Sequence, residues 1–195
     1  MAERSIDLKL IVGLGNPGSE YTKTRHNAGF WFVEELAATY GASFRREKKF
    51  HGEVAKVSIA GRDIWLLKPE TFMNRSGQSI KSLSSFYQMN AENILVAHDE
   101  LDLEVGVIKL KMGGGHGGHN GLRDTIAHLG TKNFHRLRIG IGHPGSKNHV
   151  VDYVLHRPSQ DDRIGIDNAI SDALSVMSLL AEGAMEKAMH QLHSR

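Results

Sequence analysis

His26 is the residue whose surroundings in the sequence most favour chemistry. It lies in Thr24-Arg25-His26-Asn27, on a polar connector just before an expected helix. An imidazole has an ordinary pKa near 6.5, so a neutral histidine can take up a proton at physiological pH, as a general base must. The chain has 12 histidines, however, and the alternative of an ordinary surface histidine stays open.

Asp99 is the acidic partner that we expect for His26. It follows the apolar run Ile94 to Ala97, which predicts a short buried strand, and it begins the polar stretch His98-Asp99-Glu100-Leu101-Asp102. A carboxylate on one ring nitrogen would fix the tautomer of His26 and raise the basicity of the other nitrogen. The alternative interpretation of this stretch is a solvated acidic turn.

Water is the nucleophile that the composition favours for such a site. The chain contains no cysteine and no Gly-x-Ser-x-Gly elbow, which removes the common protein nucleophiles of hydrolases. Asn16, Asn74 and Asn120 each lie at a turn near an expected strand end or helix start. Their amides could orient a water or donate to a developing oxyanion. Asparagine in a turn also serves backbone geometry alone, so this second interpretation remains.

Two cofactor-based alternatives are weaker. Gly13, Gly15 and Gly18 match a dinucleotide-binding pattern, but Pro17 occupies the turn and no apolar-striped helix follows at once. A metal site could draw on His116 and His119 together with His98, Asp99 and Asp102. Glycines flank His116 and His119, and there is no His-Glu-x-x-His helix. We therefore expect neither a nucleotide cofactor nor a metal. Glycines in the 113–121 segment fit close approach of backbone amides to a ligand better.

Positive charge is expected on two neighbouring strands. Formal net charge is only +2, so any anion site must come from local clustering. Alternation places Lys109 and Lys111 on one face of one strand and Arg136 and Arg138 on one face of another. Such a cluster would suit phosphates, whereas the alternative is two solvated strand faces.

The elements that must position these residues alternate between strands and helices. We expect strands at 6–12, 54–59, 64–67, 94–97, 105–112 and 136–142, and helices at 27–40, from 71 or 74 to 89, 122–129 and 160–192. The Arg45–Lys49 run is expected to be a solvated loop. This order predicts an α/β fold: one layered domain over residues 1–195, with a twisted, mixed and mostly parallel sheet flanked by helices. The loops at 13–18, 98–102 and 113–121 would form the ligand site.

The bulk composition is that of a globular protein without a membrane span. The 195 residues are 40% hydrophobic and 24% charged, and we find no apolar run near 18 residues. The first residues lack the layout of a signal peptide. A cytoplasmic protein is the resulting expectation.

Five ordered blocks then show that the sequence strongly resembles bacterial peptidyl-tRNA hydrolases. They cover Val12–Gly18, Tyr21–Gly29, Thr71–Gly77, Val96–Leu103 and Gly113–Gly121, and the resemblance extends over nearly the whole chain. It implies a monomeric esterase without cofactor. Such an enzyme hydrolyses the ester between a peptide and the 3′-terminal ribose of tRNA and so recycles tRNA for translation.

The resemblance also assigns roles residue by residue. It implies that His26 activates water and that Asp99 orients it. Asn16 and Asn74 would contact the substrate around the ester, and Asn120 would hold the water or the peptide backbone. The remaining assignments are a cleft for the peptide and the terminal nucleotide (Tyr21, Phe72, Met73 and His119) and a clamp on acceptor-stem phosphates (Lys111 and Arg138, with Lys109 and Arg136 as helpers).

Overall fold

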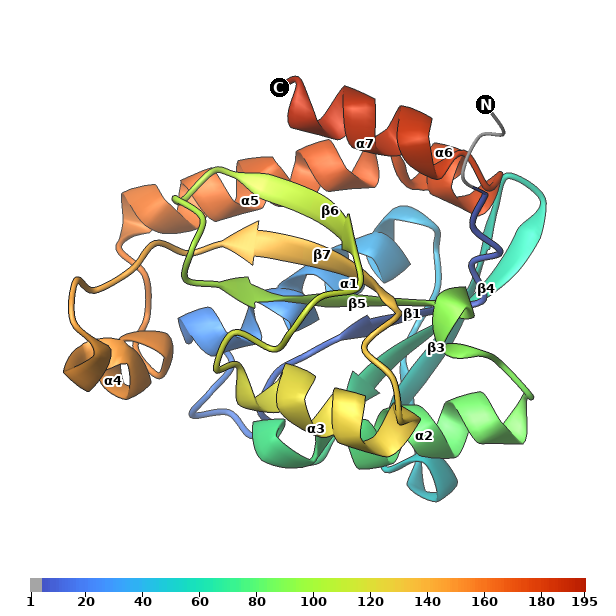
Figure 1. Ribbon diagram of the computed structural model, residues 1–195, viewed down its shortest axis with the longest axis horizontal. Helices are drawn as coiled ribbons and strands as arrows, with labels where there is room; N and C mark the ends of the chain where they lie inside the picture. The colour runs from blue at the N-terminus through green and yellow to red at the C-terminus, as the bar shows by residue number, and fades with distance from the viewer. Residues whose placement is uncertain (1–4) are drawn as a thin grey trace.

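One seven-stranded sheet runs through the molecule (Figure 1). The computed structural model describes residues 5–195. Its strands are β1 (Leu10–Gly13), β2 (Arg45–Glu47), β3 (Gly52–Ile59), β4 (Arg62–Pro69), β5 (Ile94–Glu100), β6 (Ile108–Met112) and β7 (His135–Gly140). They lie in the order β2-β3-β4-β1-β5-β7-β6. The central β4, β1, β5 and β7 are parallel, whereas β2, β3 and β6 pair antiparallel at the two edges. The predicted mixed α/β sheet is confirmed.

Helices cover both faces of this sheet. The α-helices are α1 (Ala28–Thr39), α2 (Ser76–Phe86), α3 (Asn120–Leu129), α4 (Val150–Val154), α5 (Gln160–Leu174), α6 (Met177–Ala181) and α7 (Met185–His193). Short 3-10 helices span Arg25–Asn27, Lys48–Phe50, Met73–Arg75, Ala91–Asn93 and Lys147–His149. In Figure 1, α2 and α3 lie on one side of the sheet and α1 and α5 on the other. Among the described residues, no helix has the length and apolarity that crossing a membrane requires.

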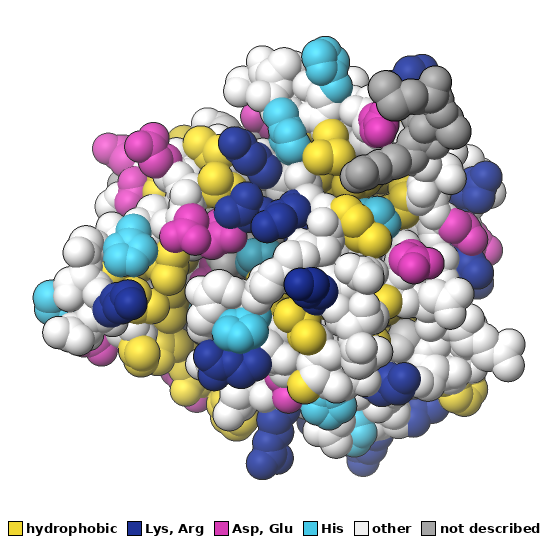
Figure 2. All heavy atoms as spheres, in the orientation of Figure 1, with side chains coloured by type: hydrophobic (Ala, Val, Ile, Leu, Met, Phe, Trp, Pro, Cys, Tyr) yellow, Lys and Arg dark blue, Asp and Glu magenta, His cyan; other side chains and the backbone are white. Residues whose placement is uncertain are grey.

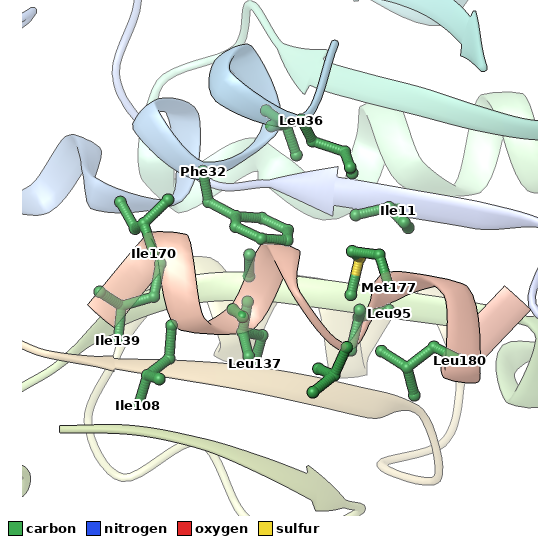
Figure 3. Packing of buried hydrophobic residues seen from close by; sticks show 14 of the residues in the cluster. Ile11, Phe32, Leu36, Leu95, Ile108, Leu137, Ile139, Ile170, Met177 and Leu180 are labelled. Atoms are coloured by element: carbon green, nitrogen blue, oxygen red, sulfur yellow. The ribbon is translucent and has the colours of Figure 1, made fainter. Parts of the chain in front are cut away.

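The core divides into two apolar clusters because strand side chains alternate between the two faces. On β1, Ile11 joins the cluster beneath α1, α5, α6 and α7, while Leu10 and Val12 join the one beneath α2 and α3. Figure 3 shows the first cluster, where the ring of Phe32 projects from α1 toward α5 and the sheet. Both faces of β1 are buried, so its sequence is continuously apolar.

Several element boundaries differ from the sequence-based prediction. Residues 6–9 lie outside β1, Arg45–Glu47 form an edge strand, and α4 had not been predicted. The expected helix at 160–192 is three helices. Its second break falls at Gly183, whose φ of +92° ends a right-handed helix.

Close packing at two glycines brings the start of α1 onto the central strands. A Cβ on Gly13 would lie 2.2 Å from the carbonyl oxygen of Gly29, and a Cβ on Gly29 would lie 2.4 Å from that of Ala97. Backbone thus meets backbone where α1 crosses the ends of β1 and β5. Gly15 likewise lies against the Phe30 ring. Packing therefore accounts for Gly13 and Gly15, two of the glycines that mimic a dinucleotide motif.

Candidate active site

His26 and Asp99 meet at the carboxyl end of β5. His26 lies in the 3-10 turn before α1, and its Nδ1 is 2.8 Å from Oδ2 of Asp99. The expected strand at 94–97 extends to Glu100, so Asp99 is on the strand itself and its side chain is only 2% exposed. The contact between α1 and β5 explains how residues 73 positions apart come together.

His119 donates to the other oxygen of the same carboxylate. Its Nε2 lies 2.8 Å from Asp99 Oδ1. Its Nδ1 accepts the backbone N–H groups of Gly121 and Leu122, which caps the start of α3. Because Nδ1 is an acceptor, the proton of His119 is on Nε2. The carboxylate is therefore held between two imidazoles whose ring centroids are 5.1 Å apart.

The charge states follow from these contacts. Burial favours a protonated Asp99, but His26 and His119 outweigh it and hold the pKa of that carboxyl far below its usual range. Burial would lower the pKa of His26, yet the charge and hydrogen bond of Asp99 raise it above 6.5 overall. An ionised carboxylate only accepts, so Nδ1 of His26 carries the proton and Nε2 holds a free electron pair when the ring is neutral.

His98 is a neighbouring histidine of a different kind. It is 2% exposed, its Nδ1 lies 2.9 Å from the backbone oxygen of Asp99, and its ring packs edge-on against His119. Burial, followed by the nearness of His119, lowers the pKa of His98 to about 4. It is thus an uncharged packing partner of the site.

Asn16 presents an amide donor whose orientation is fixed. Its Oδ1 accepts the backbone N–H of Met73 at 2.7 Å, and its own backbone N–H and C=O bond the side chain of Asn27. With Oδ1 so engaged, Nδ2 is the free end of the amide. The position of Asn27 just before α1 is typical of a helix cap, but its side chain makes no capping bond and instead holds the Asn16 loop.

One cavity of about 700 Å³ collects most of the predicted site. It is lined by eight of the predicted residues: Asn16, His26, Phe72, Met73, Asn74, Asp99, His119 and Asn120. Tyr21 lies outside this lining but meets Phe72 edge-to-face at 6.4 Å. Arg123 donates to Oδ1 of Asn120 at 3.3 Å. Apolar residues of α4 and its flanks, among them Val151 and Leu155, form another wall that the sequence had not indicated.

The glycine-rich segment reaches this cavity by a different path than predicted. Because β6 is antiparallel to β7, residue 113 lies at the opposite end of the sheet from Asp99. The segment runs back along the molecule, with positive φ at Gly113, Gly114, Gly117 and Gly118. Its end delivers His119 and Asn120 to the site.

The two arginines of β7, Arg136 and Arg138, differ in their exposure and in their hydrogen-bond partners. Arg136 is 2% exposed, and its terminal nitrogens bond the backbone oxygens of Gly114 and Gly115, so it anchors the glycine-rich segment and is not available to a phosphate. Arg138 is partly exposed. Lys109 pairs with it across the strands, and Lys109 and Lys111 are both exposed. Figure 2 shows Lys and Arg side chains gathered over β6.

The one set of residues within 5–195 that could hold a metal ion is His26, Asp99 and His119, whose ligand atoms lie within 4.8 Å of one another. The predicted metal alternative had included His116, which is not in this set. A metal would have to replace both hydrogen bonds to Asp99.

The fold and the cavity define an α/β protein with an Asp-held histidine at the carboxyl ends of parallel strands, an arrangement that is compatible with hydrolytic chemistry. A family model described as peptidyl-tRNA hydrolase matches residues 10–195. The peptidyl-tRNA hydrolase of Neisseria gonorrhoeae (strain NCCP11945) is 56% identical over 188 residues, which are 96% of this chain and 98% of that protein. That of Acinetobacter baumannii (strain AYE) is 57% identical over 188 residues, 96% of this chain and 97% of the other.

Solved structures agree with these sequence matches. A crystal structure of peptidyl-tRNA hydrolase from Acinetobacter baumannii is 55% identical, covers 99% of this chain and 98% of its own, and superposes with a TM-score of 0.95. The chain belongs to the peptidyl-tRNA hydrolase family, and it is a hydrolase. The resemblance stated from the five sequence blocks is confirmed.

Proposed function

We propose that the protein hydrolyses the ester between a peptide and the 3′-terminal ribose of tRNA, with water activated by His26. The observation that carries this proposal is the His26–Asp99 hydrogen bond beside the oriented amide of Asn16, inside one cavity. Ester hydrolysis by water needs a general base that activates the water and a donor that stabilises the oxyanion.

The proposed reaction proceeds in two steps. Nε2 of His26 takes a proton from water as the water oxygen bonds to the ester carbonyl carbon, and the carbonyl oxygen becomes an oxyanion. Nδ2 of Asn16 donates to this oxyanion, while Asp99 stabilises the imidazolium. The tetrahedral intermediate then expels the ribose 3′ oxygen, which receives the proton from His26. A free peptide acid and a free tRNA result.

The size of each effect is sufficient for an activated ester. General-base help is typically worth about 10²- to 10⁴-fold in rate. One oxyanion donor adds about 10²- to 10³-fold. His119 supports this chemistry by holding the second oxygen of Asp99, and no further ionisable group is required.

The rest of the cavity surface suits the two ends of the substrate. Exposed Phe72 and the apolar wall near Val151 would pack against peptide side chains or the terminal base. Asn74 and Asn120 line the cavity with groups able to bond peptide amides or a water. Lys111 and Arg138, assisted by Lys109, would clamp an acceptor-stem phosphate. We propose in addition that the enzyme acts as a monomer in the cytoplasm, since one chain supplies the entire candidate site.

The test is release of tRNA from an N-blocked aminoacyl-tRNA in the presence of a chelator. We expect stoichiometric free tRNA and N-blocked amino acid. A chain that bound the tRNA without releasing the amino acid would be an RNA-binding module, and the proposal would be wrong. Hydrolysis that stopped on addition of the chelator would contradict the water-and-histidine mechanism.

A further inference from the structure

Glu100 connects the proposed catalytic residues to the proposed phosphate clamp. It follows Asp99 on β5 and lines the same cavity. Its Oε1 accepts the Nε–H of Arg138 at 2.9 Å, and its Oε2 accepts the backbone N–H of Asp102 at 3.3 Å. Both side chains of the Glu100–Arg138 pair are about one-fifth exposed, at 19% and 22%. The carboxylate is thus fixed at both oxygens.

The strand register explains why Glu100 turns toward Arg138. Directly opposite Glu100 on β7 is Gly140, which has no side chain, and the loop oxygens of Glu104 and Val107 fill the space where a Cβ would lie. Arg138 is two residues earlier on the same face, which makes the pair a diagonal cross-strand neighbour. Successive residues on β5 thereby serve two different partners: Asp99 bonds His26 and Glu100 bonds Arg138.

The hydrogen bond to Glu100 engages only the Nε of Arg138. Among residues 5–195, its Nε is bonded to Glu100 and its two terminal nitrogens donate to no protein acceptor. Arg136 is the contrasting case, since carbonyl oxygens occupy its terminal nitrogens. A guanidinium fixed through Nε presents its two terminal amino groups as a planar fork, the geometry that matches two phosphate oxygens.

We propose that Glu100 is a positioning residue that aims Arg138 at a tRNA phosphate. The proposal rests on the proposed function, since it assumes that Arg138 contacts the acceptor stem. Without Glu100 the guanidinium would lose its preset orientation, and the ordering of the side chain would weigh against binding. The carboxylate itself carries a charge that repels phosphate, so its presence beside the clamp is explained by the orientation that it gives Arg138.

The test compares KM and kcat for N-blocked aminoacyl-tRNA among five single variants and one double variant. Loss of a charge-assisted hydrogen bond predicts that Glu100→Ala raises KM about tenfold. Its kcat should change by less than about twofold, because binding and not bond-making is affected. Glu100→Gln keeps an oxygen that accepts from Nε and should restore a KM near that of the wild type. Glu100→Asp keeps the charge on a shorter side chain and should behave like Glu100→Ala.

Two further variants separate the possible causes. Glu104→Ala removes an exposed acidic side chain from the same loop without touching Arg138, and it controls for a general change of charge. The double variant Glu100→Ala/Arg138→Ala should have the KM of Arg138→Ala alone.

Four results would overturn the inference. A KM that fell in both Glu100→Ala and Glu100→Gln would mean that the carboxylate only repels phosphate. A loss confined to kcat would mean that Glu100 supports the reacting groups. If Arg138→Ala left KM unchanged, the clamp of the proposed function would itself be wrong; if it raised KM while Glu100→Ala and Glu100→Asp did not, the clamp would stand and only the role of Glu100 would fail.

Discussion

Nε2 of His119 lies 2.8 Å from Oδ1 of Asp99, the carboxylate oxygen that His26 does not use. With both oxygens engaged by imidazole N–H groups, the carboxylate cannot rotate away from His26. His119 also fixes the start of α3, because its other ring nitrogen, Nδ1, caps that helix. Orientation of the proposed base and the position of Asn120 therefore depend on the same side chain.

His119→Asn separates these two roles. Asparagine is a good helix cap but is too short to bond Asp99 from this position. We expect kcat to fall about tenfold, since one of two donors to a buried carboxylate is lost, while the cap of α3 is kept. His119→Ala loses the same donor and the cap, so it should be about 1 kcal/mol less stable than His119→Asn. Thermal melts and turnover of N-blocked aminoacyl-tRNA measure both, and a wild-type kcat in His119→Asn would show that the bond does not matter for catalysis.

The acid limb of the pH profile reports the protonation of His26. A general base must be neutral, and Asp99 raises the pKa of His26, so kcat/KM should fall as pH drops through a midpoint above 6.5. Asp99→Asn removes the negative charge, which moves that midpoint to lower pH. It also removes the preferred tautomer, so the plateau should fall about 10²-fold. A midpoint that stayed in place in Asp99→Asn would mean that another group titrates.

Lys111 and Arg138 should determine the salt dependence of tRNA binding. Each phosphate contact releases counterions, so loss of one contact reduces the slope of log Kd against log salt by about one. We expect Lys111→Ala and Arg138→Ala to show this reduction and to hydrolyse an N-blocked aminoacyl ester of adenosine at wild-type rates. Lys187→Ala, which removes an exposed positive charge from α7 and leaves β6 and β7 unchanged, is the matched control. Equal slopes in all proteins would remove these residues from the clamp.

Gly29→Ala tests the backbone contact that brings α1 to β5. The new Cβ would meet the carbonyl oxygen of Ala97 and the backbone of Leu14, none of which is a flexible side-chain end. Overpacking of this kind costs about 1–3 kcal/mol in the free energy of unfolding, and here it would also move His26 away from Asp99. Gly115→Ala, whose Cβ meets nothing within 4 Å, is the control for denaturant melts. Equal stability of the two variants would contradict the packing account.

The sequence predicts which segments form helices and strands better than it predicts which side chains contact one another. Apolar β1 and β5 are recognisable because burial leaves a local pattern, although β5 extends to Glu100 and carries Asp99 on the strand itself. Alternation places Arg136 and Arg138 on one face, but it cannot reveal that Gly114 and Gly115 enclose the first and leave the second partly exposed. Asn27 is a similar case. Its position before a helix predicts a cap, whereas its actual partner is 11 residues away and depends on tertiary packing.

Turnover by His26→Ala tests the role of His26 most directly. We expect kcat for N-blocked aminoacyl-tRNA to fall about 10²- to 10⁴-fold, the range of general-base catalysis, while the Kd for tRNA and the melting temperature stay close to wild type. His190→Ala, an exposed histidine of α7, is the matched control and should keep full activity. Turnover by His26→Ala at a near wild-type rate would contradict the assignment of His26 as the base.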